Sequence, residues 1–255
     1  DHPKYTLFRP VALKDRSWPN HLITKAPYWC SVDLRDGNQA LVNPMDVDQK
    51  TKMFELLVKL GFKEIEIGFP SASKPDFDFT RKLIDERLIP EDVTVQVLTQ
   101  ARKDLIDRTY DSLKGVKRAI VHLYNSTSVV QREQVFRISE DGILNIATTG
   151  AKWVREASMK FPHTEWMFQY SPESFTGTDL DHAVAVCESV VSEWKPETGR
   201  KVIINLPATV EMSTPNVFAD QVEYFCRHLE QRDKLTISLH THNDRGCAVA
   251  AAELG

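Results

Sequence analysis

The sequence predicts a parallel α/β fold and, within that class, a (β/α) barrel. Seven short apolar segments rich in β-branched residues begin 24 to 48 residues apart. A parallel strand–helix–strand unit needs about 30 residues, so this spacing fits crossover connections better than hairpins. The segments between them have helical periodicity, and polar residues follow nearly every apolar segment. In a barrel these polar ends meet at one mouth, whereas a doubly wound open sheet gathers its ligand groups at one or two switch points.

The expected strands are the apolar segments themselves. They cover residues 28–33, 64–68, 93–98, 117–122, 165–170, 201–206 and 235–240. The polar sequences that follow them are LRDGNQ, GFPSAS, LTQAR, LYNSTS, YSPESF, LPATVE and HTHND. No turn after a strand carries the GxGxxG of a dinucleotide-binding fold. We therefore expect all seven strand ends to contribute to one site.

The expected helices have one apolar face each. Residues 179–194 and 215–230 repeat apolar side chains at helical spacing, and Pro215 takes the first helical position of the second one. A short helix near 128–137 and a longer one over 139–161 fill the widest interval between strands. Residues 47–60 are expected to form a helix that ends at Gly61. Its predicted buried face consists of Met53, Leu56, Leu57 and Leu60.

The first 27 residues differ from the rest of the chain. They contain four prolines and no sustained periodicity, so we expect an extended arm over residues 1–27 on the outside of the domain. We expect residues 28–255 to form the barrel domain that carries the site. Seven strands can be counted in the sequence, one fewer than the eight that close a (β/α) barrel.

Composition excludes several classes of protein. There are 36 acidic and 32 basic residues without a basic cluster, which argues against binding to nucleic acid or to an anionic membrane. No apolar run reaches the roughly 18 residues needed to span a bilayer, and the first residues lack the pattern of a signal peptide. The four cysteines form no CxxC pair and are expected to be free thiols in a reducing compartment. These features predict a cytoplasmic location.

The most specific motif is the run from His240 to Asp244 at the end of the seventh strand. Alternate residues of a strand face the same side, so His240 and His242 project together. Two imidazoles at a barrel mouth are suited to binding a divalent metal ion, together with a carboxylate. The alternative is that one histidine packs or caps while the other is solvated. The preceding apolar strand and the following Asn-Asp favour the metal site.

A second polar motif, LRDGNQ, follows the first strand. Strand periodicity places Asp33 and Arg35 on one face, but it does not decide whether Asp33 or Asp36 is the inward carboxylate. An arginine–aspartate pair on the surface beside a glycine turn is the alternative interpretation.

These motifs resemble those of the 2-isopropylmalate and homocitrate synthase family. The first signature of that family is similar to LRDGNQ followed, after ten intervening residues, by Lys50. The second signature is similar to the run from His240 to Gly246. The segments GFPSASKPDFDF, VQVLTQAR, VHLYNSTS and FQYSPESFTGTD resemble the long bacterial type of 2-isopropylmalate synthase. The resemblance covers nearly the whole chain from Pro27 onward.

The resemblance implies a function and a set of ligands. These enzymes condense acetyl-CoA with a 2-oxo acid, here 3-methyl-2-oxobutanoate, and release CoA in leucine biosynthesis. By analogy, Asp36, His240 and His242 would bind the divalent metal ion, which is Mg²⁺, Mn²⁺ or Zn²⁺. Arg35 would hold the developing alkoxide or the substrate carboxylate, and Thr209 would donate a hydrogen bond to that carboxylate.

The family's substrate pocket also carries over onto this sequence. Glu173 is a candidate for acid–base catalysis or for positioning a base, and the alternative is a structural salt bridge. His122 is expected in the pocket, and the alternative is a buried histidine that serves only the core. Ser171 completes the polar part, while Leu98 and Pro207 would shape the apolar wall for the isopropyl group.

The chain also departs from the family. The resemblance implies a (β/α)8 TIM barrel with about seven of its eight strands in this sequence, and the full-length family members are homodimers. We expect the chain alone to have little or no synthase activity and to aggregate through its unpaired sheet edge. The alternatives are a related homocitrate or citramalate synthase, or a metal-binding relic without catalytic activity.

Overall fold

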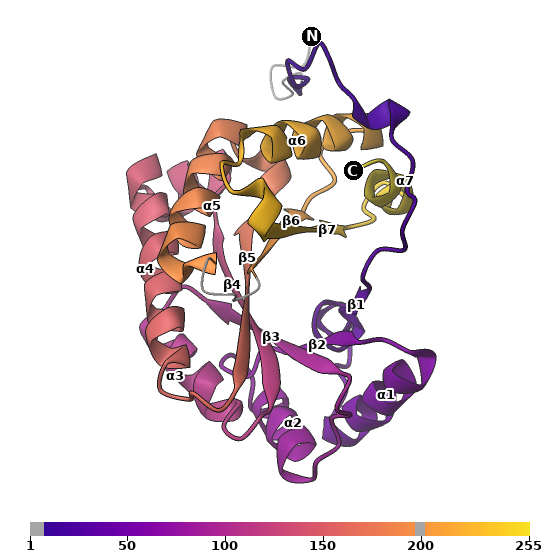
Figure 1. The fold of residues 1–255 in the computed structure, drawn as a ribbon, viewed down its shortest axis with the longest axis vertical. Helices are drawn as coiled ribbons and strands as arrows, with labels where there is room; N and C mark the ends of the chain where they lie inside the picture. The colour runs from indigo at the N-terminus through magenta and orange to yellow at the C-terminus, as the bar shows by residue number, and fades with distance from the viewer. Residues whose placement is uncertain (1–7, 197–201) are drawn as a thin grey trace.

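The protein forms one sheet of seven parallel strands whose order in the sheet is their order in the sequence. The structure is a computed structural model, and it describes residues 8–196 and 202–255. Figure 1 shows the sheet curling around a central space, with helices on its outer side. The predicted α/β barrel architecture is therefore confirmed. The strands are β1 (Cys30–Ser31), β2 (Glu64–Gly68), β3 (Thr94–Gln100), β4 (Arg118–Ser126), β5 (Glu165–Glu173), β6 (Val202–Ala208) and β7 (Leu235–Thr241).

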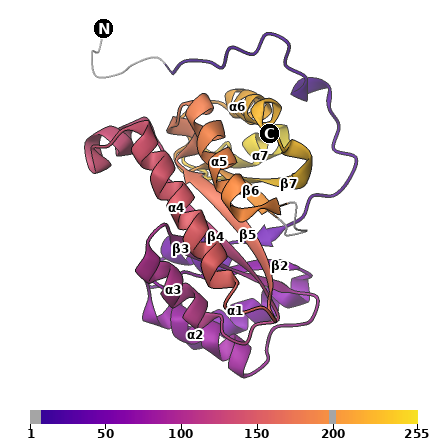
Figure 2. The ribbon, with the colours of Figure 1, turned by 60° about the vertical axis from the view of Figure 1, so that its left-hand side comes forward.

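A helix follows each strand and covers the outside of the sheet (Figures 1 and 2). The short helix expected near 128–137 is present as a single wide turn, Gln131–Phe136. The long helix expected over 139–161 is also present. The α-helices are α1 (Val47–Leu60), α2 (Lys74–Asp85), α3 (Lys103–Ser112), α4 (Glu140–Ser158), α5 (Leu180–Trp194), α6 (Pro215–His228) and α7 (Ala248–Leu254).

The core lies between the strands and these helices. On α5 the predicted stripe consists of Leu180, Val184, Cys187, Val191 and Trp194. Leu180 is partly buried against the core and the other four are buried; Trp194 stacks on Phe168 of β5 at 4.8 Å between ring centroids. On α6 the predicted stripe, Phe218, Val222, Phe225 and Leu229, is buried as well, and Pro215 begins the helix as expected. Both helices therefore present the apolar face that their sequence periodicity indicates.

The predicted buried face of α1 is only partly correct. Leu57 is buried and Met53 packs against the core as expected, but Leu56 is 48% exposed and Leu60 is 66% exposed. The fully buried residues of this helix are Lys50, Phe54 and Leu57. The true stripe contains a lysine, whose ammonium group forms an ion pair with Asp76 of α2. A charged residue within the stripe conceals its period, because apolar spacing alone selects a neighbouring face. The end of the helix is as predicted, with Gly61 in the left-handed conformation.

The first strand is shorter than expected. The sequence indicated a strand over residues 28–33, but β1 pairs with β2 only at Cys30 and Ser31. Tyr28 and Trp29 are exposed at 86% and 71%. After Ser31 the backbone turns into a wide helical turn, Asp33–Gly37. The apolar pattern over residues 28–33 therefore predicted a longer strand than the structure contains, and the polar motif that follows takes a helical conformation.

Residues 8–29, which precede β1, run along the outside of the molecule, as Figure 2 shows. In the described part, residues 8–29, its one helical element is the turn Trp18–Asn20. The guanidinium of Arg16 donates two hydrogen bonds to Asp220 of α6, and the indole of Trp18 donates a third at 2.8 Å. The predicted arm also includes residues 1–7, and the strand predicted over 201–206 includes Lys201; both lie outside the described residues.

The two ends of the sheet are edges. Within residues 8–196 and 202–255, β1 pairs only with β2 and β7 pairs only with β6. All four cysteines are free thiols, as expected. Across the described helices, none is both long enough and apolar enough to cross a membrane.

Candidate metal and substrate site

A polar pocket lies at the carboxyl ends of the strands, where the sequence predicts the site. Its volume is about 190 Å³. All ten residues singled out from the sequence line it, and they come from both ends of the chain and from strands between them. These residues are Arg35, Asp36, Leu98, His122, Ser171, Glu173, Pro207, Thr209, His240 and His242.

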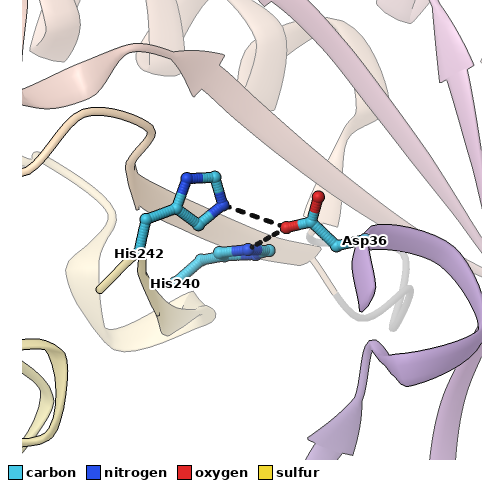
Figure 3. A group of neighbouring side chains, drawn as sticks. All are labelled: Asp36, His240 and His242. Atoms are coloured by element: carbon cyan, nitrogen blue, oxygen red, sulfur yellow. Dashed lines mark hydrogen bonds and ion pairs between the residues drawn. The ribbon is translucent and has the colours of Figure 1, made fainter. Parts of the chain in front are cut away.

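Three of these side chains converge on one point, as Figure 3 shows. The Oδ2 atom of Asp36 lies 2.8 Å from Nε2 of His240 and 3.0 Å from Nε2 of His242. One ligand atom from each residue lies within 4.8 Å of the other two. The two imidazole rings stand edge to face at 5.2 Å.

The local backbone explains why these groups meet. His240 is the second-last residue of β7, and His242 lies just beyond the end of the strand. Because alternate residues of a strand face the same side, both rings point in the same direction. Asp36 lies in the wide turn after β1, which carries it across the barrel mouth toward the histidines. Asp33 instead accepts a hydrogen bond from the Ser31 hydroxyl at 2.6 Å. Of the two carboxylates left open by strand periodicity, Asp36 is therefore the one that faces the histidines.

The three side chains fit a divalent metal ion. The Nδ1 atom of His242 lies 2.8 Å from the carbonyl oxygen of Thr209, so it carries a proton and leaves Nε2 directed at Asp36. Two imidazole nitrogens and one carboxylate oxygen are an accepted ligand set for Zn²⁺, Mn²⁺ or Mg²⁺ with open positions for substrate. Hydrogen bonds from His240 and His242 hold the pKa of Asp36 well below its ordinary value. The carboxyl group is therefore an anion, as a metal ligand must be.

Arg35 is held beside this cluster by a buried carboxylate. Its Nε donates to Glu66 of β2, and its Nη1 lies 3.1 Å from Oδ1 of Asp36. Glu66 is fully buried, and burial alone would raise its pKa. The positive charge of Arg35 and the hydrogen bond with His122 outweigh burial, so the pKa of Glu66 is held well below its ordinary value. Arg35 therefore has a permanent anionic partner.

His122 belongs to a buried polar cluster rather than to the apolar core. Its Nδ1 lies 2.6 Å from Glu66, and its Nε2 lies 2.7 Å from the Ser171 hydroxyl. Asn205 of β6 donates to the same hydroxyl oxygen at 2.8 Å. Burial lowers the pKa of His122. His122 is buried, as the alternative of a core histidine predicted, but it also lines the pocket.

Glu173 and Thr209 lie at the ends of β5 and β6. The Ser126 hydroxyl donates to the Glu173 carboxylate. The backbone N–H of Ser174 donates to the Thr209 hydroxyl oxygen at 2.9 Å, and Ser174 has a positive φ of 61°. Because the oxygen of Thr209 is used as an acceptor, its proton is available to donate into the pocket. The left-handed turn at Ser174 fixes where the β5 strand ends and so positions Glu173.

Several residues in or next to the pocket were not predicted from the sequence. Glu66 does not line the pocket, but it contacts Arg35 and His122, which do. It is an acid within the buried strand sequence EIEIG, which is a signal that alternation could have identified. Tyr124 lies two residues after His122, and Asn205 lies two residues before Pro207, so period two relates each to a predicted residue. Gln39, the last residue of the LRDGNQ motif, and Phe69, directly after β2, also line the pocket. Strand periodicity relates neither of them to a predicted residue.

Lys50, which belongs to the first signature, lies outside the pocket. Its ammonium group is fully buried, pairs with Asp76 and donates to the carbonyl oxygen of Ile67 at 3.2 Å. Asp76 also accepts from the backbone N–H of Phe69 at 2.8 Å. The lysine therefore supports the loop that carries Phe69, one wall of the pocket.

Comparison with known proteins shows the family to which the chain belongs. The profile of the HMGL-like family matches residues 26–255, and the chain belongs to this family. Among solved structures, the HMG-CoA lyase of Bacillus subtilis is similar over 90% of this chain and 76% of its own, with a TM-score of 0.63 and 20% identity. The HMG-CoA lyase of Brucella melitensis has a TM-score of 0.62 at 15% identity, over 88% of this chain and 75% of its own. At these identities the structures support the fold alone.

Two 2-isopropylmalate synthases are more similar to this chain in sequence than the two lyases are. The 2-isopropylmalate synthase of Acetoanaerobium sticklandii is 57% identical over 255 residues, which are 100% of this chain and 45% of the relative. The 2-isopropylmalate synthase of Rhodospirillum rubrum is 62% identical over 252 residues, 98% of this chain and 45% of the relative. The chain thus spans somewhat less than half the length of these relatives.

Proposed function

We propose that the protein provides the catalytic barrel of a 2-isopropylmalate synthase. This acyltransferase joins acetyl-CoA to 3-methyl-2-oxobutanoate in leucine biosynthesis. The methyl carbon of acetyl-CoA loses a proton and forms a bond to the ketone carbon, and water then cleaves the thioester to release CoA. The observation that carries the proposal is the convergence of Asp36, His240 and His242 with Arg35 in one pocket, in a chain whose named relatives are such synthases.

The metal cluster and its neighbours would orient the 2-oxo acid. A divalent ion held by Asp36, His240 and His242 would polarise the ketone as a Lewis acid. Glu66 and Asp36 both form ion pairs with the Arg35 guanidinium and so fix its orientation. Its remaining N–H groups would then stabilise the ketone oxygen of the substrate as that oxygen becomes negative. The Thr209 hydroxyl proton, which the Ser174 contact leaves free, would donate to the substrate carboxylate.

Glu173 is the proposed acid–base residue. Its carboxylate lines the same pocket and accepts from Ser126, which fixes one oxygen and leaves the other for a proton from substrate or water. The Ser174 turn holds this carboxylate at the end of a rigid strand. Its role as a structural salt bridge is not favoured, because no ion pair with Glu173 occurs among the described residues.

The remaining pocket residues fit a small branched side chain. Leu98 and Pro207 line the cavity beside His122 and Ser171. A volume of about 190 Å³ accommodates a five-carbon 2-oxo acid but not a CoA molecule. One methylene in such a wall changes discrimination by about 1–3 kcal/mol, so the choice among 2-oxo acids depends on these side chains.

The whole protein's partners follow from the same proposal. We infer that acetyl-CoA and 3-methyl-2-oxobutanoate are the substrates, that the full-length protein is a homodimer, and that it acts in the cytoplasm. Low activity of the chain by itself remains a prediction. It is supported by β1 and β7, each of which pairs on one side only among the described residues, because a site at the mouth of an open sheet is held less rigidly than one in a closed barrel.

The proposal is tested by measuring CoA release in the full-length protein that contains this chain. We expect turnover with 3-methyl-2-oxobutanoate to exceed that with pyruvate or 2-oxoglutarate, to require a divalent metal, and to be abolished in His240→Ala. His163→Ala, which changes an exposed histidine far along the chain from the motif, is the matched control. Preference for pyruvate or 2-oxoglutarate would favour the citramalate or homocitrate reaction. Metal binding without turnover on any 2-oxo acid would favour the relic.

A further inference from the structure

His242 is held less firmly by the sheet than His240 is. The pairing of β7 with β6 ends at Thr241, so His242 lies one residue beyond the paired strands. Its backbone N–H donates to the carbonyl oxygen of Ala208 at 3.4 Å, which is a long contact, and its side chain is 36% exposed. The side chain of His240, which lies within the strand, is 14% exposed. The position of His242 therefore depends on the loop that follows β7.

The loop after β7 is joined to the loop after β6 by hydrogen bonds whose directions are fixed. The carbonyl oxygen of Thr209 can only accept, so Nδ1 of His242 donates to it at 2.8 Å. The backbone N–H of Glu211 donates to Oδ2 of Asp244 at 2.8 Å. In the opposite direction, the backbone N–H of Arg245 donates to Oε2 of the Glu211 carboxylate. Glu211 thus binds, with its backbone and with its side chain, the two residues that lie two and three positions after His242.

Glu211 is buried where its apolar neighbours are exposed. The exposed fraction is 8% for Glu211, compared with 54% for Val210 and 44% for Met212. Burial of an acid costs free energy, whereas burial of the two apolar side chains would be favourable. Within the described residues the Oε1 atom of Glu211 has no hydrogen-bond partner, so the carboxylate holds the loop through Oε2. Such departures from the hydrophobic pattern are expected where a side chain serves a site.

The other side of the same loop is fixed to α7. The Oδ1 atom of Asn243 accepts from the backbone N–H of Ala248 at 3.1 Å, and the Thr241 hydroxyl donates to the carbonyl oxygen of Ala248 at 3.0 Å. Gly246 has a positive φ of 78°, which lets the chain turn before it enters the helix. These contacts hold the loop to the helix that follows it. Glu211 joins it instead to the end of β6.

We propose that Glu211 is a positioning residue of the metal site, which fixes His242 by holding the loop after β7 against the loop after β6. The inference rests on the metal site of the proposed function. Groups that orient a metal ligand change the metal affinity about tenfold to hundredfold when they are removed. The hydrogen bond from Arg245 requires an oxygen acceptor at position 211 and not a negative charge. An amide at this position should therefore replace the carboxylate.

Binding of Mn²⁺ to this chain tests the proposal without turnover, with the free ion measured by electron paramagnetic resonance. We expect Glu211→Ala to raise the dissociation constant about tenfold to hundredfold. Glu211→Gln, which keeps an oxygen acceptor for Arg245, should bind Mn²⁺ as tightly as the unchanged protein. Tyr110→Phe, which removes a buried hydrogen bond to Val154 of α4 at 2.9 Å, is the control for lost stability. It should lower the urea midpoint and leave the affinity unchanged.

Equal affinity in Glu211→Ala and the unchanged protein overturns the proposal. Equally weak binding by Glu211→Ala and Glu211→Gln also overturns it, because the effect would then belong to the charge. If the unchanged chain binds no Mn²⁺, the proposed metal site itself fails, and the positioning role fails with it.

The exposed residue Asp244 provides a second pair of variants, which decides if circular dichroism shows that Glu211→Ala does not fold. Asp244→Ala removes the acceptor of the Glu211 backbone N–H, whereas Asp244→Asn keeps an oxygen there and removes only the charge. We expect weaker Mn²⁺ binding in Asp244→Ala than in Asp244→Asn. Equal affinity of these two variants overturns the proposal.

Discussion

Glu66 is the residue on which the polar side of the pocket depends. It is fully buried and contacts Arg35, Gln96 and His122 at once. A buried carboxylate is tolerated only when its partners compensate for lost hydration, and removal of one partner leaves the others uncompensated. The site and the stability of the barrel are therefore coupled through this side chain.

Glu66→Gln should destabilise the protein at pH 7. We expect the free energy of unfolding to fall by about 3 kcal/mol, because the Arg35 guanidinium would lose its fully buried anionic partner and keep only the partly exposed Asp36. Urea denaturation measures this change. Asp92→Asn, which breaks the exposed pair with Lys63, is the control and should leave the midpoint unchanged. Equal midpoints for Glu66→Gln and the unchanged protein would contradict the assigned role.

The effect of Glu66→Gln should also depend on pH in one direction. The folded-state pKa of Glu66 is lowered, so its contribution to stability is present above the unfolded-state pKa of about 4.3 and is lost as the pH falls toward the folded value. The difference between the two proteins should therefore be constant near neutral pH and shrink below about pH 4.3. Repeating the urea series between neutral and acidic pH measures it, and a difference that grows on acidification would contradict the sign.

Single residues of the site were predictable where a strand presents them. His240 and His242 follow from period two, and the ten residues indicated by motifs and family resemblance all line one pocket. Asp36 was not separable from Asp33 by periodicity, because the chain leaves the strand after Ser31 and forms a wide turn. That turn depends on tertiary contacts such as the pair between Arg35 and Glu66, which are 31 residues apart.

At the scale of elements, α6 serves two sides of the molecule. Its apolar stripe packs into the core, while Asp220 and Glu223 bind the segment before β1. Asp220 is 4% exposed and accepts hydrogen bonds from Arg16 and Trp18. Within residues 8–29 of this segment Leu13 is the one buried apolar side chain, so we expect these polar contacts to contribute much of what holds it.

Asp220→Asn should release this segment without unfolding the barrel. The neutral amide cannot pair with both guanidinium nitrogens of Arg16, so we expect backbone amides of residues 17–21 to exchange hydrogen at least about tenfold faster. Hydrogen–deuterium exchange with mass spectrometry measures this rate. Asp181→Asn, which alters an exposed contact between α5 and Tyr224 of α6, is the control. Unchanged protection in Asp220→Asn would show that the segment is held by other contacts.

Elements were most predictable where burial is uniform and least where charge enters the core. The predicted stripes of α5 and α6 contain only apolar residues and were identified correctly, whereas the buried Asp220 of α6 lies outside its stripe, against the segment before β1. On α1 the buried Lys50 shifts the face by one position, which no hydrophobic pattern reveals. The ion pair that permits this burial involves Asp76 of the next helix and is visible only in three dimensions.

At the scale of the whole molecule, the open sheet leaves apolar surface next to its edges. Leu56 and Leu60 of α1 and Val249 of α7 are exposed, at 48%, 66% and 72%. Both helices belong to the units that contain the edge strands, as Figure 1 shows. Exposed edges and apolar patches promote association between chains.

Leu60→Glu should therefore reduce self-association of this chain. We expect a lower weight-average mass at high protein concentration, because the charge opposes burial of the α1 face. Analytical ultracentrifugation over a concentration series measures this. Met159→Glu, at an equally exposed apolar residue just after α4, is the matched control and should have no effect. Equal effects of the two variants would contradict a specific role for the edge region.

The central claim is that Asp36, His240 and His242 hold a divalent metal that binds a 2-oxo acid in this pocket. Calorimetric titration of 3-methyl-2-oxobutanoate into the chain tests it most directly, because binding requires no turnover. With Mg²⁺ or Mn²⁺ present, we predict binding to the unchanged protein and to Asp33→Asn, whose carboxylate faces Ser31. Addition of EDTA or the change Asp36→Asn should weaken binding at least about tenfold, as loss of a metal ligand does. Binding of equal strength in Asp36→Asn, or in the presence of EDTA, would contradict the claim.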